Sequence, residues 1–236
     1  QPMGMIYGYI YEGTYKYDDF DKSGSSYTLK GNIPHYVSES NTQPGMPKYK
    51  DLNGDGIIDT NDRTMIGRGL PIHTGGFTNN FEYKGFDLSV FFQWSYGNDV
   101  LNANRLFFDS GFQKKRELNQ YASYTNRWTP ENPNSDIPAA TNSSSNLVIS
   151  SRVVEDASFL RLKTVTLGYT VPKTFLKKYK IDNARLYVAA QNLWTITGYS
   201  GYDPEVSIRS GGLTPGLDFS SYPRALSVSF GINLGF

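Results

Sequence analysis

The chain has 236 residues, a formal net charge of +1 and no cysteine, so neither a strongly basic nucleic-acid-binding domain nor thiol chemistry, disulfides or cysteine zinc sites are expected. Aromatic residues make up 15% of the chain, with 18 Tyr, 14 Phe and 23 Gly, which favours strands punctuated by turns. No apolar run reaches the roughly 18 residues of a transmembrane helix.

In chain order, the first expected element is a strand from Met5 to Lys16, a segment rich in Tyr and Gly. Residues 17–72 are rich in Ser, Asn, Asp, Gly and Pro and predict a long loop with one ordered motif. A second long loop is predicted over residues 98–157, with a short helix near Lys114 to Arg127. A third loop is predicted over residues 197–222.

The ordered motif in the first loop runs from Asp51 to Asp62 and reads DLNGDGIIDTND. Its oxygen-bearing groups follow the spacing of an EF-hand calcium loop, and Gly56 stands where that loop turns sharply. The predicted metal ligands are the side chains of Asp51, Asn53, Asp55, Asp59 and Asp62 and the backbone carbonyl of Ile57.

Two features separate this motif from an ordinary EF-hand. Its last ligand is Asp62 rather than Glu, and Pro44 and Pro47 leave no room for an incoming helix. We therefore expect a structural calcium clip that orders an external loop, rather than a calcium sensor. The alternative is a cluster of Asn-Gly and Asp-Gly turns that binds no metal.

The clearest hairpin is predicted from two strands, His73 to Tyr83 and Phe86 to Tyr96, joined by Lys84 and Gly85. Large apolar side chains occupy alternate positions on both strands, which indicates one apolar face. A tight turn on one side combined with long loops on the other is typical of bacterial outer-membrane barrels.

Three more strands are predicted from Ser158 to Val171, Asn183 to Ile196 and Ala225 to Phe236. In the last one, every second residue is large and apolar, and the positions between carry Ala, Ser, Gly or Asn. A strand of a soluble sheet would carry charged residues on its wet side, so this pattern favours lipid on one side and a crowded lumen on the other. The predicted fold class is all-β, an antiparallel transmembrane β-barrel segment of about six strands with long extracellular loops.

The orientation that fits this pattern places the carboxyl terminus in the periplasm and residues 17–72, 98–157 and 197–222 outside the cell. Aromatic side chains then form two girdles at the membrane interfaces. The outer girdle consists of Trp94, Tyr96 and Trp194, and the inner one of Tyr83, Phe86, Tyr169 and Phe236.

One strand departs from the pattern, because Arg161 and Lys163 share alternate positions with Phe159 and Val165. Either the outer half of this strand projects above the hydrocarbon, where the cations meet lipid phosphates, or a β-bulge switches its faces. About six strands also cannot close a membrane barrel, for which eight is the usual minimum. We expect the missing strands in an amino-terminal portion of the same barrel outside this chain.

Candidate catalytic residues are scarce. His35 and His73 are the only histidines, and neither has the neighbours of a catalytic triad or zinc site. Asp203 and Glu205 flank Pro204 and could in principle serve a glycosidase, but their setting indicates a turn. We therefore do not expect an enzyme.

Several segments together resemble the SusC/RagA family of TonB-linked outer-membrane transporters. They are GYIYEGTY, YKDLNGDGIIDTNDR, IGRGLPIHTGGFTNNFEYKGFDLSVFFQWSYGN, RWTPENP, FLRLKTVTLGYTVP, ARLYVAAQNLWTITGYSGYDPE and the final strand. The resemblance covers nearly the whole chain, follows the order of the family, and corresponds to the carboxyl-terminal portion of its barrel.

The resemblance implies a barrel of about 22 strands that imports oligosaccharides or peptides together with a SusD-like surface lipoprotein. TonB would act through a plug and a TonB box, neither of which is visible in this sequence. The implied partners are the remaining amino-terminal part of the same barrel, the SusD-like lipoprotein, TonB, an oligosaccharide or peptide ligand and outer-membrane lipid, with no nucleic acid.

The competing hypothesis is a secreted calcium-dependent carbohydrate-binding or adhesion β-domain. It predicts a water-soluble monomer whose outward strand faces carry charge. The apolar faces of the strands from Phe86 to Tyr96 and from Ala225 to Phe236 disfavour it.

Overall fold

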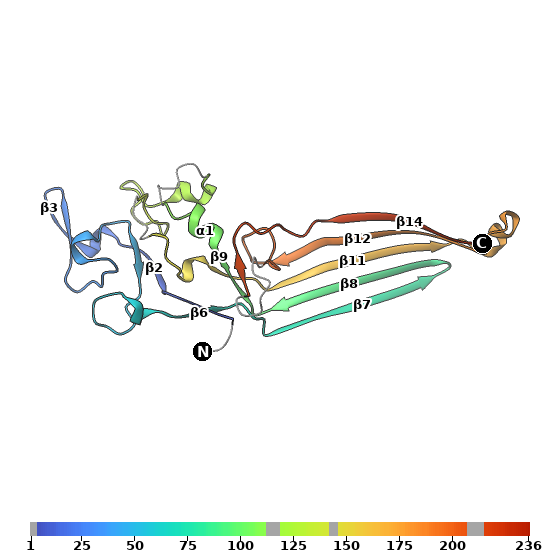
Figure 1. Cartoon of the computed structure of the whole chain (residues 1–236). Coiled ribbons are helices and arrows are strands. Elements are labelled where there is room, and N and C mark those ends of the chain that lie inside the picture. Colours follow the sequence, from blue (N-terminus) through green and yellow to red (C-terminus); the bar gives the residue numbers. More distant parts are fainter. Residues whose placement is uncertain (1–3, 112–118, 142–145, 207–214) are drawn as a thin grey trace. The chain divides into compact units, whose positions relative to one another are not determined.

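Figure 1 shows the computed structural model of the chain, which describes residues 4–111, 119–141, 146–206 and 215–236. The chain divides into two compact units, each assembled from segments that are distant in the sequence. The first unit consists of Gln1–Leu70, Asp99–Glu155 and Ser207–Ser221, and the second of Pro71–Asn98, Asp156–Val206 and Tyr222–Phe236.

The first unit is built from short paired strands. β1 (Met5–Gly8) pairs with β6 (Thr64–Arg68), β2 (Tyr11–Thr14) with β5 (Pro47–Tyr49), and β3 (Phe20–Ser23) with β4 (Ser26–Leu29), all antiparallel. Another sheet has the order β10 (Val154–Asp156), β9 (Asp99–Asn102) and β13 (Leu217–Asp218).

Helical segments in this unit are short. The α-helix α1 covers Ala103–Phe108, and the 3-10 helices are η1 (Tyr17–Asp19), η2 (Glu39–Asn41), η3 (Thr60–Asp62), η5 (Ala122–Asn126) and η7 (Ser151–Val153). Within the segment from Lys114 to Arg127, where a short helix is predicted, the structure has the 3-10 helix η5. Residues 112–118 lie outside the described residues.

Tyrosine side chains form much of the core of the first unit. Tyr9, Tyr49 and Ile58 make one buried cluster, in which the ring centroids of Tyr9 and Tyr49 are 5.3 Å apart. Tyr15 belongs to a second buried cluster with Phe20. The amino-terminal segment therefore packs inside this unit.

The single strand predicted from Met5 to Lys16 is wrong. The segment forms β1 and β2, and neither strand joins the long sheet of the second unit. Thr14 and Tyr15 are both buried, at 2% and 1% exposed, so the period-two alternation of a membrane strand is lost. Gly13 adopts a φ of +101° at a register shift in β2, which interrupts the strand further.

The second unit is one antiparallel sheet of long strands (Figure 1). Its order is β14 (Ser227–Gly235), β12 (Asn183–Thr197), β11 (Phe159–Thr170), β8 (Phe86–Tyr96) and β7 (His73–Tyr83). The connection between β11 and β12 contains α2 (Lys173–Leu176) and η8 (Lys177–Tyr179).

The long sheet confirms the strands predicted after residue 72. Each long strand pairs with the next long strand along the chain, as hairpin connections require. Among the described residues, no helix has the length and apolar character needed to cross a membrane. The strand pairing confirms the all-β fold class, with five long strands in the sheet rather than about six.

Candidate functional site

One face of the long sheet is apolar and exposed, and we call it the apolar face. The pairing register sets large apolar residues side by side in rows, so that Leu88, Leu167, Val188 and Phe230 form one row across the strands. Phe230 is 82% exposed. A contiguous apolar surface of this kind marks contact with lipid or with another protein layer.

The members of the apolar face alternate along each strand. They are Phe77, Phe81 and Tyr83 of β7; Phe86, Leu88, Val90, Phe92 and Trp94 of β8; Leu160, Leu162, Val165, Leu167 and Tyr169 of β11; Leu186, Val188, Ala190, Trp194 and Ile196 of β12; and Val228, Phe230, Ile232 and Leu234 of β14.

Aromatic residues gather at the two ends of this face, as the girdle prediction requires. At one end the rings of Phe86 and Tyr169 are 4.6 Å apart, and Tyr83 is the register partner of Phe86. At the other end Trp94 stands opposite Leu160, and Trp194 stands opposite Leu162. This distribution is typical of strands that span a bilayer.

A β-bulge decides where Arg161 and Lys163 face. The pairing with β8 skips one residue of β11 between Leu162 and Thr164, so Leu162 and Val165 share the apolar face although one is even-numbered and the other odd-numbered. Arg161 faces the opposite side of the sheet and is only 2% exposed. The expectation that these cations meet lipid phosphates is therefore wrong, and the bulge alternative is correct.

Arg161 is the centre of a buried ion cluster on this opposite face. Its Nη2 donates a hydrogen bond to Asp203 Oδ1 at 2.6 Å, and its Nη1 donates to Glu205 Oε2 at 2.7 Å. Its Nε donates to Thr195 Oγ1 of the neighbouring strand at 2.9 Å. Because all three nitrogens of the guanidinium are used, the side chain fixes the segment after β12 to the sheet.

Two further cations complete the cluster around Glu205. Lys163 Nζ lies 3.1 Å and Arg224 Nε lies 3.0 Å from its Oε2. Burial alone would raise the pKa of Asp203, but the hydrogen bond from Arg161 and the backbone N–H groups of Glu205 and Arg224 outweigh it and lower the pKa. A carboxylate held as an anion cannot serve as a general acid, so Asp203 is not suited to that role in a glycosidase.

The sequence predicts a turn at Asp203 and Glu205, without their partner Arg161. Arg161 and Asp203 are 42 residues apart in the chain, so local patterns do not connect them. One signal was available in the sequence. The strand with Arg161 and Lys163 is otherwise apolar, and two acidic residues follow the next strand, β12.

The opposite face of the sheet is mostly polar. Arg185 of β12 donates from Nε to Asp87 Oδ1 of β8 at 2.9 Å. The ring of Tyr187 lies over Gly231 of β14, where a Cβ atom would collide with it. Polar pairs and glycines covered by rings are suited to a crowded barrel interior.

The predicted calcium loop folds around its own side chains. Asp51 accepts hydrogen bonds from the backbone N–H groups of Gly54 and Gly56 at 2.7 and 2.8 Å. Both glycines have positive φ, at +77° and +83°, which is why glycine suits these positions. Asn53 Oδ1 accepts from the N–H of Asp55 at 3.0 Å.

Asp62 closes the loop and is fully buried, at 0% exposed. Its carboxylate accepts the backbone N–H groups of Leu52 and Asp59 at 2.7 and 2.8 Å. Burial opposes ionisation of this group, but these backbone hydrogen bonds prevail and lower its pKa. Asp59 in turn caps η3 by accepting from the N–H of Asn61 at 2.7 Å.

The structure thus brings all the predicted ligands, including Ile57, into one compact loop whose carboxylates face backbone amides. Within the described part of the chain, no group of three or more His, Asp or Glu side chains is arranged as a metal site. Calcium binding by this loop therefore stays a prediction.

The two histidines have structural contacts. The backbone of His35 pairs with the predicted calcium loop, accepting from Ile58 N at 2.9 Å and donating to Gly56 O at 3.2 Å. The ring of His73 accepts a hydrogen bond at Nδ1 from Trp94 Nε1 at 3.1 Å.

Comparison with models of protein families gives no match. The chain is 37% identical over 241 residues to TonB-dependent receptor P3 of Formosa agariphila, an alignment covering 100% of this chain and 22% of that protein. It is 29% identical over 201 residues to TonB-dependent receptor SusC of Bacteroides thetaiotaomicron, covering 85% of this chain and 18% of that protein. The chain thus spans about a fifth of the length of these relatives.

Solved structures show the same similarity in three dimensions. The RagAB peptide transporter matches 98% of this chain and 23% of that chain, with a TM-score of 0.69 and 27% identity. The RagAB peptide importer in the closed-closed state matches 98% and 23%, with a TM-score of 0.70 and 25% identity.

Proposed function

Because this chain belongs to the SusC/RagA family of TonB-dependent receptors, we propose that it forms part of the wall of an outer-membrane transporter. TonB-dependent receptors are outer-membrane β-barrels, so the long sheet is an arc of such a barrel. The observation that carries the proposal is the exposed apolar face, on which Phe230 and Ile232 are 82% and 64% exposed.

The connections between the strands support a topology for this arc. The tight turn at Lys84 and Gly85 and the short connection over residues 172–182 lie on the periplasmic side with the carboxyl terminus, and residues 17–72, 98–157 and 197–222 are extracellular. β7 and β14 are the edges of the described sheet. Strands from the rest of the receptor pair with these edges, because open edges in lipid would leave backbone groups unsatisfied.

The transported solute in this proposal is an oligosaccharide or a peptide. The structural neighbour RagAB is described as a peptide transporter, which supports solute import. A SusD-like surface lipoprotein would hold the solute against the extracellular segments of this chain. TonB would release it inward through a plug supplied by the rest of the receptor.

Calcium is proposed as a structural ligand of residues 51–62. The oxygens of Asp51, Asn53, Asp55, Asp59 and Asp62 and the carbonyl of Ile57 provide the hard donors that Ca²⁺ prefers. The glycine turns at Gly54 and Gly56 support the proposal, because they let a short loop wrap around one point. Ca²⁺ would neutralise the carboxylates and order an extracellular segment.

The test is fractionation of cells that express the receptor containing this sequence, followed by electrophoresis of heated and unheated samples in detergent. We expect recovery in the outer membrane and a band that shifts on heating, because a closed barrel resists the detergent until it is heated. A soluble protein with no shift would refute the proposal and favour the secreted calcium-dependent β-domain.

A further inference from the structure

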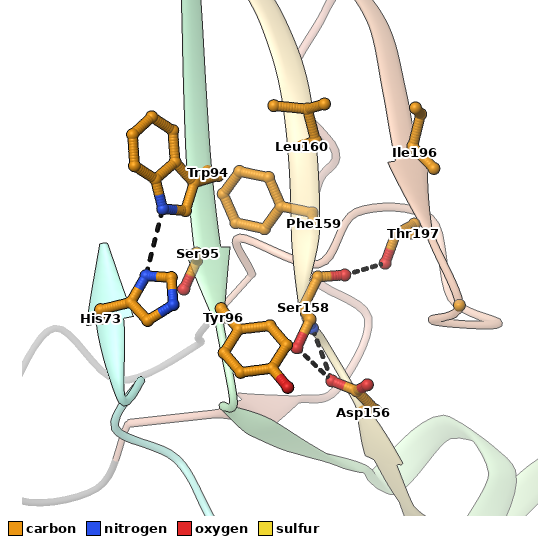
Figure 2. A pocket seen from close by; sticks show the side chains of 11 residues that line it. His73, Trp94, Ser95, Tyr96, Asp156, Ser158, Phe159, Leu160, Ile196 and Thr197 are labelled. Carbon is orange, nitrogen blue, oxygen red and sulfur yellow. Dashed lines mark hydrogen bonds between the residues drawn. The ribbon is translucent and has the colours of Figure 1, made fainter. Parts of the chain in front are cut away.

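One end of the apolar face carries a groove of about 480 Å³ between side chains of β7, β8, β11 and β12 (Figure 2). We propose that this groove binds a single amphiphile with a sugar headgroup, whose alkyl chain runs along the apolar face. The inference rests on the proposed placement of that face against lipid, and it adds a binding site distinct from the transport path.

The side walls of the groove are apolar and continue into the apolar face. Trp94, Leu160 and Ile196 are register neighbours on three adjacent strands. Leu160 and Ile196 are 36% and 47% exposed. The next row contains Phe92 and Leu162, so an alkyl chain leaving the groove stays in contact with apolar side chains and with neighbouring lipid.

The indole of Trp94 is held in place before any ligand binds. It lies over Gly75 of β7, where a Cβ atom would collide with the ring. Its Nε1 points toward His73 and donates to Nδ1 at 3.1 Å, as Figure 2 shows. A preformed wall of this kind lowers the entropy cost of binding.

Tyr96 provides the surface for a sugar ring. His73 stacks against one side of the Tyr96 ring, with centroids 5.1 Å apart and an angle of 24°, and Tyr96 remains 55% exposed. Tyrosine and tryptophan, which combine an apolar ring with a polar group at one end, are favoured at membrane interfaces, where headgroups lie. The apolar C–H face of a sugar can pack on the exposed side of this ring.

The polar side of the groove selects against anionic headgroups. Among the described residues that line it, Asp156 alone is formally charged. Its Oδ1 accepts from the backbone N and the Oγ of Ser158, and Ser158 Oγ accepts from Gly97 N at 2.9 Å. No hydrogen bond among the described residues occupies Asp156 Oδ2, so this oriented oxygen can accept a sugar hydroxyl but would repel a phosphate.

The test uses the complete receptor, purified in dodecyl octaethylene glycol ether and mixed with dodecyl maltoside or with maltose, with bound copies counted by native mass spectrometry. We expect one dodecyl maltoside to be retained at least tenfold better than the glycol ether, which has the same alkyl chain and no sugar. Maltose alone should not be retained. Equal retention of the two detergents would refute the sugar-specific site.

Variants locate the binding. Tyr96→Ala and Asp156→Asn should each lower retention of dodecyl maltoside at least tenfold, and the asparagine can still accept the hydrogen bonds from Ser158. Tyr83→Ala is the matched control, because Tyr83 is an exposed tyrosine at the opposite end of the same face, 69% exposed. Unchanged retention in Asp156→Asn, or an equal loss in Tyr83→Ala, would overturn the assignment.

Heat-modifiable migration of each variant separates this inference from the proposed function. An assembled receptor without selectivity for dodecyl maltoside refutes the groove site alone. A parent receptor that never enters the outer membrane refutes the transporter proposal itself. If Tyr96→Ala fails to assemble, the Asp156→Asn variant decides the question.

Discussion

An arginine in place of Phe230 would put a charge on the apolar face of β14, where the native side chain is 82% exposed. If that face contacts acyl chains, the charge must leave water for hydrocarbon. In transmembrane barrels this costs about 2–4 kcal/mol at the bilayer midplane and about 0–1 kcal/mol near the interfaces. The cost at a given residue therefore reports its depth in the membrane.

The pairing register gives the depth of each position. From Phe86 to Trp94 the apolar face of β8 spans about 26 Å along the strand, or about 20 Å along the membrane normal at a tilt of about 40°. The middle of the apolar face is the row that contains Val90 and Val228. Phe230 lies one row, about 5 Å, from that middle. Phe230→Arg should therefore cost about 2–3 kcal/mol, and Leu234→Arg, about 15 Å from the middle, about 0–1 kcal/mol.

Ser229→Arg is the matched control, because Ser229 precedes Phe230 in β14 and its side chain lies on the other face of the sheet. Its register partner is Ala189. The assay is guanidinium unfolding of the receptor in lipid, followed by loss of the heat-modifiable band. We expect Phe230→Arg to lower the free energy of unfolding more than Leu234→Arg or Ser229→Arg. A larger loss for Ser229→Arg, or equal losses at positions 230 and 234, would refute the assignment of this face to lipid.

Asp55→Ala should leave residues 51–62 equally sensitive to protease with and without calcium, whereas calcium should protect the parent. Equal protection of both proteins would show that calcium does not order this loop. Arg161→Met removes the cation that pairs with the buried carboxylate of Asp203 and should lower the free energy of unfolding by about 3–5 kcal/mol; a guanidinium titration that finds less than about 1 kcal/mol would mean that the cluster contributes little. Because the fold lowers the pKa of Asp203 from 3.8, its contribution to stability is complete above that value and is lost as the pH falls through the lower folded pKa. Asp203→Asn should abolish that part of the acid dependence in a pH series of unfolding measurements, and an unaltered series would contradict it. Gly75→Val should displace the indole of Trp94 and shift its fluorescence emission, so an unshifted spectrum would show that the ring does not need the glycine.

Local sequence patterns predicted most of the long sheet. All five strands were located to within two residues at each end, because alternation of side chains is a property of the extended backbone itself. The same alternation identified the apolar face and the aromatic residues at its two ends. The spacing of Asp and Gly from Asp51 to Asp62 likewise predicted a compact loop, since its hydrogen bonds join residues close in sequence.

Tertiary structure decided what depends on distant partners. The segment from Met5 to Lys16 resembles a strand, yet Tyr9 and Tyr15 are buried in the first unit, and only their packing partners determine that. The side on which Arg161 lies depends on the bulge at Lys163, which exists only relative to the pairing of neighbouring strands.

The groove at Trp94 shows the same division between sequence and structure. The sequence alone predicts an aromatic residue at a membrane interface. Strand register places Trp94 over Gly75 and within hydrogen-bonding distance of His73. The fold also brings Asp156, which precedes β11, to the same groove. Sequence determines the character of each face because that character is local, and tertiary structure determines the sites because they join residues that the chain keeps far apart.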